Sequence, residues 1–245
     1  MSVDGRVGLL VTCLIDLVRP RIGFAALRLL EAAGCEVTVP ASQTCCGQPG
    51  WNSGDRPSAR ALARKVIEEF EPCAYVVAPS GSCAGMVRVH YPALFPDDGA
   101  WLERAERLAA KTWELTDFLV RVARFDQIPG EYAGTVTYHD SCAGLRELGV
   151  QQQPRALMAK MRGVQLKEMR EAETCCGFGG TFSVKFGEIS AAMAKTKCDH
   201  VHASGAGAVV LGDLGCMLNI EGKLRRMGDD KTRVLHVAEL LTWEK

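Results

Sequence analysis

The sequence predicts an α/β protein made of two pseudo-symmetric halves, each a mainly parallel sheet with flanking helices, produced by an internal duplication. The first observation behind this prediction is a cysteine framework that occurs twice. A single cysteine is followed by a vicinal Cys-Cys-Gly and then by a last cysteine, with nearly equal spacing in both copies. The two sets are Cys13, Cys45, Cys46 and Cys83, and Cys142, Cys175, Cys176 and Cys216.

The second observation is an alternation of short β-branched runs with longer helical stretches, in the same order in both halves. In the first half we expect strands at 6–12, 36–39 and 75–78, and helices at 23–33 and 57–70. In the second half we expect strands at 135–138, 164–167 and 208–211, and helices at 154–161 and 188–203. Strands that alternate with helices usually run parallel, because the helix returns the chain to the start of the sheet.

The domain organisation follows from this repeat. The first half is predicted at residues 1–124 and the second at 134–245, joined by a linker at 125–133 that contains Pro-Gly. The first and last cysteines of each set come directly after predicted strands. Because ligands of parallel sheets bind beyond the carboxyl ends of the strands, we expect each half to bring four thiols to one edge of its sheet.

The composition of the chain argues against several classes of protein, including nucleic-acid-binding and membrane-spanning proteins. The chain has 245 residues, 47% of them hydrophobic, and equal numbers of acidic and basic side chains, so it lacks the basic field that nucleic-acid binding needs. No apolar run approaches the length of a membrane span, and the N-terminus does not resemble a secretory signal. We therefore expect a cytoplasmic protein. In that compartment 11 cysteines indicate metal binding or redox chemistry rather than disulfides.

Four thiolates in one place suit either Zn²⁺ or an iron–sulfur cluster. Structural zinc sites usually take cysteine pairs separated by a few residues, and this chain has no such pair. Two adjacent cysteines direct their sulfur atoms apart. This geometry favours a cluster of several metal atoms over a single metal ion. Clusters are therefore the preferred interpretation, with zinc and vicinal disulfide chemistry as alternatives.

The residues around the cysteines resemble a known family, the cysteine-rich (CCG) domain family of iron–sulfur oxidoreductases. It includes the B subunit of heterodisulfide reductase and subunits of lactate- and glycolate-oxidising systems. The matching stretches are CCGQP at 45–49, PSGSC at 79–83, HDSC at 139–142, CCGFGGTFSVK at 175–185 and DLGCMLNI at 213–220.

This resemblance implies an iron–sulfur electron-transfer subunit of a complex that oxidises L-lactate to pyruvate, with one [4Fe–4S] cluster in each half. The implied cluster ligands are the eight cysteines of the two sets. The implied partners are a ferredoxin-like iron–sulfur protein and a third small protein of the lactate utilization system. Two alternatives remain open: the same kind of subunit in a glycolate or thiol–disulfide system, and a zinc-stabilised binding module without redox activity.

One departure from the family pattern concerns Ser80 and Asp213. The heterodisulfide reductase type ends each set with C-x-x-C, and these two residues stand where the first cysteine of that pair would be. The five-thiolate cluster of that type is therefore not expected here. Ser80 and Asp213 are either oxygen ligands or, more simply, residues that form a turn and cap a helix.

Other candidates carry weaker signals. The catalytic residues are unknown, with His139 and Asp140 as candidates for a proton relay or for tuning a cluster, against a structural role at the end of a strand. No flavin or nicotinamide fingerprint is recognised, and the remaining four histidines are assigned no role. Three cysteines without a counterpart in the other half are expected to be packing residues: Cys35, Cys73 and Cys198.

Overall fold

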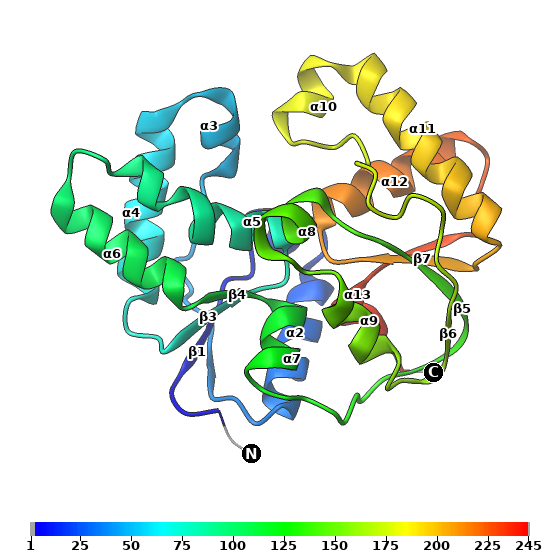
Figure 1. Cartoon of the computed structure of the whole chain (residues 1–245), viewed down its shortest axis with the longest axis horizontal. Helices are drawn as coiled ribbons and strands as arrows, with labels where there is room; N and C mark the ends of the chain where they lie inside the picture. Colours follow the sequence, from blue (N-terminus) through cyan, green and yellow to red (C-terminus); the bar gives the residue numbers. More distant parts are fainter. Residues whose placement is uncertain (1–2, 245) are drawn as a thin grey trace. The chain divides into compact units, whose positions relative to one another are not determined.

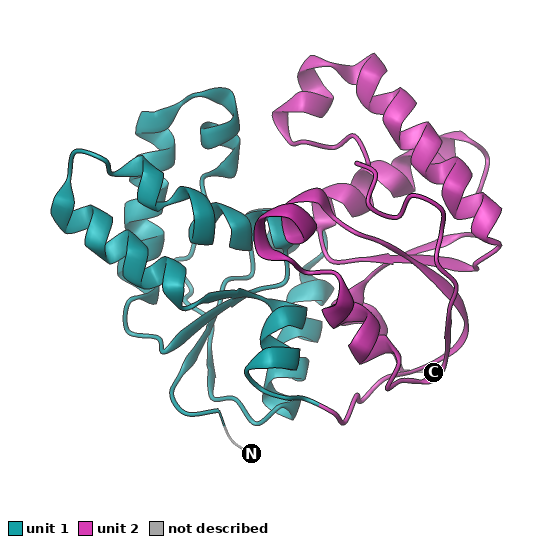
Figure 2. Cartoon of the chain, in the orientation of Figure 1, with its two compact units in different colours: residues 1–125 teal, residues 126–245 magenta. Residues whose placement is uncertain are grey.

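The computed structural model describes residues 3–244, and the chain divides into two compact units, residues 1–125 and 126–245 (Figure 2). We call them unit 1 and unit 2. Each contains a four-stranded sheet in which all strands are parallel. The predicted fold class, α/β with two repeated halves, is therefore confirmed.

The two sheets have the same strand order. Unit 1 contains β1 (Val7–Leu9), β2 (Val37–Thr38), β3 (Tyr75–Ala78) and β4 (Thr112–Glu114), arranged as β2-β1-β3-β4. Unit 2 contains β5 (Glu131–His139), β6 (Arg162–Leu166), β7 (Ala208–Leu211) and β8 (Arg233–His236), arranged as β6-β5-β7-β8. Strands β1, β3 and β7 are short and mostly apolar, as expected where helices cover a parallel sheet on both faces.

The helices of unit 1 pack on both faces of its sheet, with α2 and α7 on one face and α4 and α6 on the other (Figure 1). Helix α2 shows why, because Ile22, Ala26 and Leu29 recur on one side and are fully buried. The helical segments are α1 (Cys13–Val18), α2 (Pro20–Ala32), α3 (Gln48–Ser53), α4 (Arg56–Phe70), α5 (Gly81–Gly85), a π-helical turn (Met86–His90), a 3₁₀ turn (Pro92–Leu94), α6 (Gly99–Ala110) and α7 (Leu115–Arg121).

Unit 2 repeats this arrangement, with α9 and α13 on one face of its sheet and α11 and α12 on the other (Figure 1). Its helices are α8 (Cys142–Leu148), α9 (Gln152–Met158), α10 (Thr181–Lys185), α11 (Gly187–Ser204), α12 (Leu214–Arg226) and α13 (Val237–Leu241). Among residues 3–244, no helix combines the length and the apolar character needed to cross a membrane.

The structure differs from the predicted elements at several places. Strand β5 begins at Glu131, so it takes in the end of the predicted linker. The first cysteine of each set does not end a strand but begins a short helix, α1 or α8, neither of which was predicted. The edge strands β4 and β8 were also missed, because they are short and lead at once into helices α7 and α13.

Candidate functional site

The first cysteine set of unit 1 lies at the carboxyl edge of its sheet. Cys13 begins α1 after β1, Cys83 lies in α5 after β3, and the Cys45-Cys46 pair occupies the loop before α3. Their thiols form a continuous series of contacts, with Cys13 hydrogen-bonded to Cys45, Cys45 to Cys46, and Cys46 to Cys83. The structure therefore brings together the four thiols that the sequence placed at one edge.

Unit 2 builds the same arrangement with the second set. Cys142 begins α8, Cys216 lies in the first turn of α12, and Cys175 and Cys176 precede α10. The Cys175 thiol contacts those of Cys142 and Cys176, and Cys176 also contacts Cys216. The order of contacts along the four residues is identical to that in unit 1.

A glycine after each cysteine pair makes this loop possible. Gly47 and Gly177 have φ angles of 84° and 86°, in the left-handed region that side chains disfavour. Their backbone N–H groups each donate to the sulfur of the first cysteine of the pair, at 3.4 Å in both units. A Cβ on Gly177 would lie 2.7 Å from the backbone oxygen of Ser190, so the loop is also packed too closely for alanine.

Within each set, the contacts between thiols lower the pKa of one cysteine far more than that of the others. Hydrogen bonds from Cys13 and then Cys46 lower the pKa of Cys45 to about 3, and hydrogen bonds from Cys142 and then Cys176 lower that of Cys175 to about 2. The first cysteine of each vicinal pair is thus the one whose thiolate form is most favoured, and the thiolate is the form of cysteine that binds metals.

Different side chains hold the second cysteine of each pair in the two units. The Tyr91 hydroxyl, which is fully buried, donates to the carbonyl of Cys46 at 2.9 Å. In unit 2 the amide of Asn219, from α12, donates to the carbonyl of Cys176 at the same distance. Both bonds fix the backbone of the cysteine pair, because a buried carbonyl without a donor would be costly.

Ser80 and Asp213 lie where the sequence placed them, at the turns that follow β3 and β7. The Ser80 hydroxyl accepts from the backbone N–H of Cys83 at 3.3 Å, and the Asp213 carboxylate accepts from that of Gly215 at 3.2 Å. They are the N-cap residues of α5 and α12. The capping role considered for them is therefore present, and it orients the helices that carry Cys83 and Cys216.

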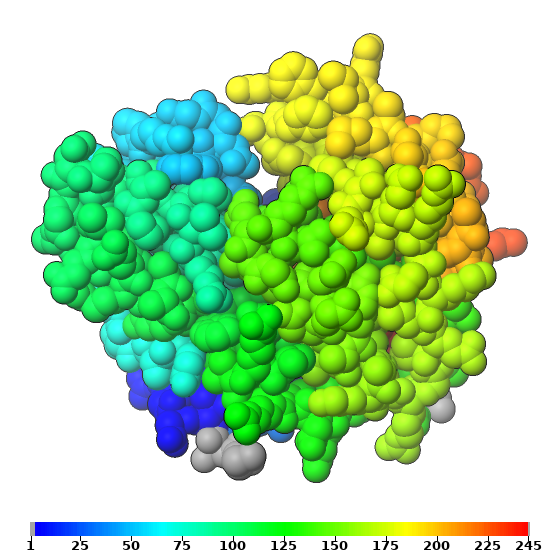
Figure 3. Space-filling model, viewed as in Figure 1, coloured from blue at the N-terminus to red at the C-terminus, as the bar shows by residue number. Residues whose placement is uncertain are grey.

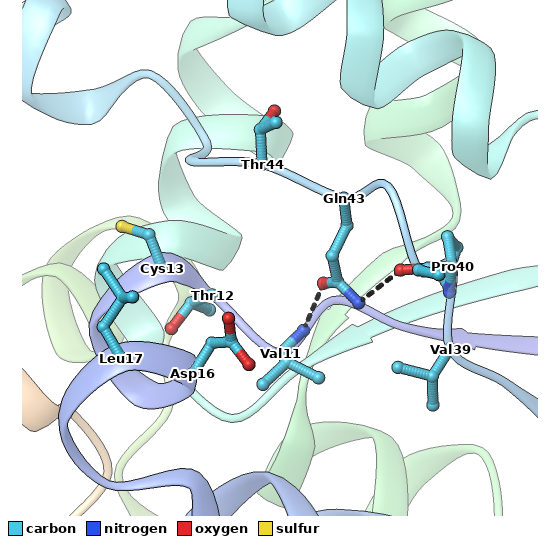
Figure 4. Close-up of a pocket in the computed structure, with 10 residues that line it drawn as sticks. Val11, Thr12, Cys13, Asp16, Leu17, Val39, Pro40, Gln43 and Thr44 are labelled. Atoms are coloured by element: carbon cyan, nitrogen blue, oxygen red, sulfur yellow. Dashed lines mark hydrogen bonds between the residues drawn. The ribbon is translucent and has the colours of Figure 1, made fainter.

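A pocket of about 290 Å³ lies beside Cys13 in unit 1 and is lined by residues of α1 and of the loop after β2 (Figure 4). The Gln43 side chain crosses this region, accepting from the N–H of Val11 at 2.8 Å and donating to the carbonyl of Pro40 at 3.1 Å. Thr12 has a φ of 75°, so the backbone is strained directly before Cys13.

His139 ends β5 beside the second cysteine set and Asp140 follows directly, and both are buried. Asp140 is held by Arg155 through two hydrogen bonds of 2.8 and 3.0 Å. A ring nitrogen of His139 and the sulfur atoms of Cys176 and Cys216 all lie within 4.8 Å of one another. Burial, followed by the charge of Lys197, lowers the pKa of His139 to about 3, so its imidazole is neutral.

Sequence reasoning missed Lys197, which is 1% exposed and donates to the carbonyls of Glu171 and Ala172 at 2.6 and 3.2 Å. The sequence did indicate that Lys197 is buried, because this residue falls between Ala194 and Val201 on the apolar side of α11. His236 was also assigned no role, yet it is fully buried. Its Nδ1 accepts from the N–H of Ala238 at 3.1 Å and caps α13.

Cys35, Cys73 and Cys198 are buried, with exposed fractions of 8%, 5% and 0%. Burial is the leading reason that the pKa of each is raised, and none of the three shifts involves another cysteine. Cys198 donates weakly to the carbonyl of Ile220 at 3.7 Å. These features are those of small packing residues.

Comparisons with known proteins match both units to one family. The cysteine-rich domain (CCG) model matches residues 7–88 and 136–221, one copy in each unit. Lactate utilization protein A of Bacillus cytotoxicus is 45% identical over 236 residues, which cover 96% of this chain and 98% of the relative. The protein of the same name from Bacillus subtilis is 44% identical over the same coverage.

Among solved structures, a hypothetical protein from Helicobacter pylori aligns with a TM-score of 0.69 at 10% identity, over 99% of this chain and 50% of that one. This likeness supports the fold alone. The resemblance drawn from the cysteine motifs is confirmed by the family match and by the relatives. The chain therefore belongs to the cysteine-rich (CCG) domain family and is a relative of lactate utilization protein A.

Proposed function

We propose that this chain is an iron–sulfur electron-transfer subunit of a multi-protein, cytoplasmic system that oxidises L-lactate to pyruvate. Each unit would hold one [4Fe–4S] cluster. The observation that carries the proposal is the pair of equivalent thiol sets, each in continuous contact at the carboxyl edge of a parallel sheet. The proposed substrate is inferred from the relatives, which are named for lactate utilization.

The donor set fits such a cluster. Soft thiolates are the ligands that iron–sulfur clusters require, and each unit supplies four of them: Cys13, Cys45, Cys46 and Cys83 in unit 1, and Cys142, Cys175, Cys176 and Cys216 in unit 2. When bound, a cluster of this kind takes up and releases single electrons.

The protein supplies position and protection at each site. The N–H groups of Gly47 and Gly177 point at cysteine sulfur, and hydrogen bonds to sulfur are one means of setting a cluster potential. Cys46 and Cys176 are each only 2% exposed, so water has little access to the inner side of either site. Cys45 and Cys175 are half-buried, which leaves one side of each site open to an electron-transfer partner.

Partners are part of the proposal, because lactate oxidation removes two electrons and this chain would carry them one at a time. We propose a ferredoxin-like iron–sulfur protein and a third small protein as companions. Large exposed apolar side chains in the segments that follow Cys13 and the Cys175-Cys176 pair support docking, since exposed apolar surface marks interaction sites. They are Leu17 and Phe24 in unit 1, and Val184, Phe186 and Ile189 in unit 2. The segment of α10 and α11 that contains the last three is coloured yellow in Figure 3.

The experiment is an anaerobic assay of lactate-dependent dye reduction with the purified chain, alone and with the proteins encoded beside it. We expect no turnover by the chain alone and turnover in the mixture. Cys176→Ser should abolish that turnover and Cys73→Ser should not. Glycolate in place of lactate tests the alternative substrate. Robust lactate oxidation by the lone chain would overturn the subunit assignment.

A further inference from the structure

The two cysteine sites differ at the buried position three residues before the first cysteine of each set. Leu10 precedes Cys13 in unit 1 at the place where His139 precedes Cys142 in unit 2, and both residues are fully buried. The thiol contacts and the glycine N–H bonds of the cysteine loops are repeated in both units. The second site therefore has a nitrogen donor beside its thiols where the first has a hydrocarbon.

The hydrogen bond at Nδ1 decides which nitrogen of His139 has a lone pair. Nδ1 lies 3.2 Å from the carbonyl oxygen of Ala172. A carbonyl oxygen can only accept, so Nδ1 carries the hydrogen and Nε2 is the bare nitrogen. Nε2 is buried and has no hydrogen-bond partner among the residues that the structure describes. A buried nitrogen without a hydrogen-bond partner lowers the stability of the fold unless a ligand binds to it.

The ring is held in this orientation by a buried scaffold. The carbonyl of Ala172 accepts three hydrogen bonds, from Nδ1 of His139, from the N–H of Asp140 at 3.1 Å, and from Nζ of Lys197 at 3.2 Å. Lys197 also binds the carbonyl of Glu171, whose φ of 54° costs roughly 1–2 kcal/mol in an L-residue. The backbone turn that places the Ala172 carbonyl against His139 is therefore strained.

Unit 1 lacks the scaffold as well as the histidine. The Cβ position of Gly47 contacts Ala59 of α4, and that of Gly177 contacts Ser190 of α11, which sets the register between the two helices. In this register Val66 of α4 corresponds to Lys197 of α11, and Val66 is fully buried. The histidine and the lysine that fixes it therefore occur together in unit 2 and are absent together from unit 1.

We propose that Nε2 of His139 is a metal ligand of the second site, alongside its thiolates, and that the first site is bound by thiolates alone. A ring nitrogen already lies within 4.8 Å of the sulfur atoms of Cys176 and Cys216. A ligating histidine typically donates its other N–H to a backbone carbonyl, as His139 does to Ala172. Imidazole suits both iron and zinc.

The consequence is that the two sites are not equivalent. A ligand set that includes a neutral imidazole differs in charge and donor strength from one made of thiolates alone, and these properties of the surroundings help to set the potential of an iron–sulfur cluster. In this chain the two clusters would therefore differ in reduction potential. The identity of the cluster in this inference rests on the proposed function. The assignment of the nitrogen ligand rests on His139 alone.

The test is pulsed EPR of the reduced, reconstituted full-length chain labelled with ¹⁵N-histidine. The variant with Cys45→Ser and Cys46→Ser retains only the second site, and Cys175→Ser with Cys176→Ser retains only the first. We expect the hyperfine coupling of a directly bound imidazole nitrogen in the first variant and none in the second. His139→Leu, which installs the residue found in unit 1, should remove the coupling from the otherwise unchanged chain.

The outcomes separate this inference from the proposed function. Iron and sulfide at the second site without strong nitrogen coupling, or a coupling that survives His139→Leu, would overturn the histidine ligand and leave the cluster. Zinc without sulfide at that site would overturn the cluster. In that case X-ray absorption at the zinc edge decides the ligand: a nitrogen neighbour lost in His139→Leu upholds it, and an all-sulfur shell refutes it.

Discussion

Nζ of Lys197 and Nδ1 of His139 share one acceptor, the carbonyl oxygen of Ala172, each at 3.2 Å. A buried lysine is unusual, since burial disfavours its charge and lowers its pKa. Its position is explained by the two carbonyls that it satisfies and by the acidic groups of the cysteine site around it. The lysine thus connects the middle of α11 to the residue that lies beside the second cysteine set.

Replacing Lys197 by methionine should destabilise unit 2, because the buried carbonyls of Glu171 and Ala172 each lose a donor. Each carbonyl keeps another donor, the N–H of Thr174 for Glu171 and the N–H of Asp140 for Ala172. The loss is therefore that of hydrogen bonds to a charged group, and the free energy of unfolding of the metal-free chain should fall by about 1.5–3 kcal/mol. The measurement is chemical denaturation followed by circular dichroism. The matched control is Lys195→Met, which removes an exposed lysine of the same helix that pairs with Asp199.

Equal losses in the Lys197→Met and Lys195→Met variants would contradict this role for Lys197. An exposed i,i+4 ion pair contributes only about 0.3–0.5 kcal/mol, so the two variants should differ clearly. The effect should also reach the site, because His139 would lose part of its support. The second-site signal in EPR is therefore expected to broaden in Lys197→Met and to stay unchanged in the control.

The two cysteine sets should bind their metals independently. Cys45→Ser or Cys46→Ser should remove the iron of unit 1 and leave that of unit 2, and Cys175→Ser or Cys176→Ser should do the reverse. Serine replaces a soft thiolate by a hydroxyl that remains protonated near neutral pH. The measurement is iron content per chain after anaerobic reconstitution.

The controls for that series are the packing cysteines, changed as Cys35→Ser, Cys73→Ser and Cys198→Ser. These variants should keep the full iron content, although each places a polar group in a buried position and loses some stability. A similar loss of iron from ligand and packing variants would show that the assignment of ligands is wrong.

Alanine at Gly177 should be more harmful than alanine at Gly47. Both glycines have a positive φ, but the added Cβ would lie 2.7 Å from the backbone oxygen of Ser190 in one case and 3.2 Å from that of Ala59 in the other. Gly149→Ala is the control for φ alone, since its φ is 68° and no atom lies within 4 Å of the Cβ position. Thermal unfolding should rank the losses as Gly177, Gly47, Gly149, and any other order would contradict the packing argument.

Glu114 should make the stability of unit 1 depend on pH. Burial raises the pKa of this carboxyl from 4.5 to about 7, despite hydrogen bonds from Thr116 and Asp117. Between these values the folded chain keeps a proton that the unfolded chain has released. The free energy of unfolding should therefore fall as pH rises from about 4.5 to about 7, by roughly 3 kcal/mol at 1.36 kcal/mol per unit, and then level off.

Glu114→Gln isolates this effect, because glutamine cannot titrate and still offers an oxygen to the same N–H groups. The free energy of unfolding of the variant, subtracted from that of the original chain, should decrease over this pH range. The measurement is denaturation of the metal-free proteins at a series of pH values. A difference that stays flat across the range would contradict the raised pKa.

Much of the fold could be predicted because strands in a parallel sheet are continuous apolar runs. The bounds of β3 and β7 are those expected from residues 75–78 and 208–211. The edge strands β4 (TWE) and β8 (RVLH) include polar or charged residues and so lack a continuous apolar run. Helices α1 and α8 were missed because each begins at a cysteine directly after a strand and is short.

The grouping of the thiols could also be predicted, since it follows from strand ends that share an edge. The surroundings of the second site could not. His139 was a candidate from its position before Cys142, but its free nitrogen depends on Ala172, which is distant in sequence. Lys197 lies in α11, and nothing local shows that its amino group reaches the strained turn at Glu171.

Metal analysis of the chain purified without oxygen tests the central claim most directly. If each unit holds a [4Fe–4S] cluster, the protein should be brown and contain iron and acid-labile sulfide in equal amounts, with little zinc. The four contacting thiols of each unit are the reason for this expectation. One zinc ion per site, with no sulfide bound after reconstitution with iron, would contradict the account.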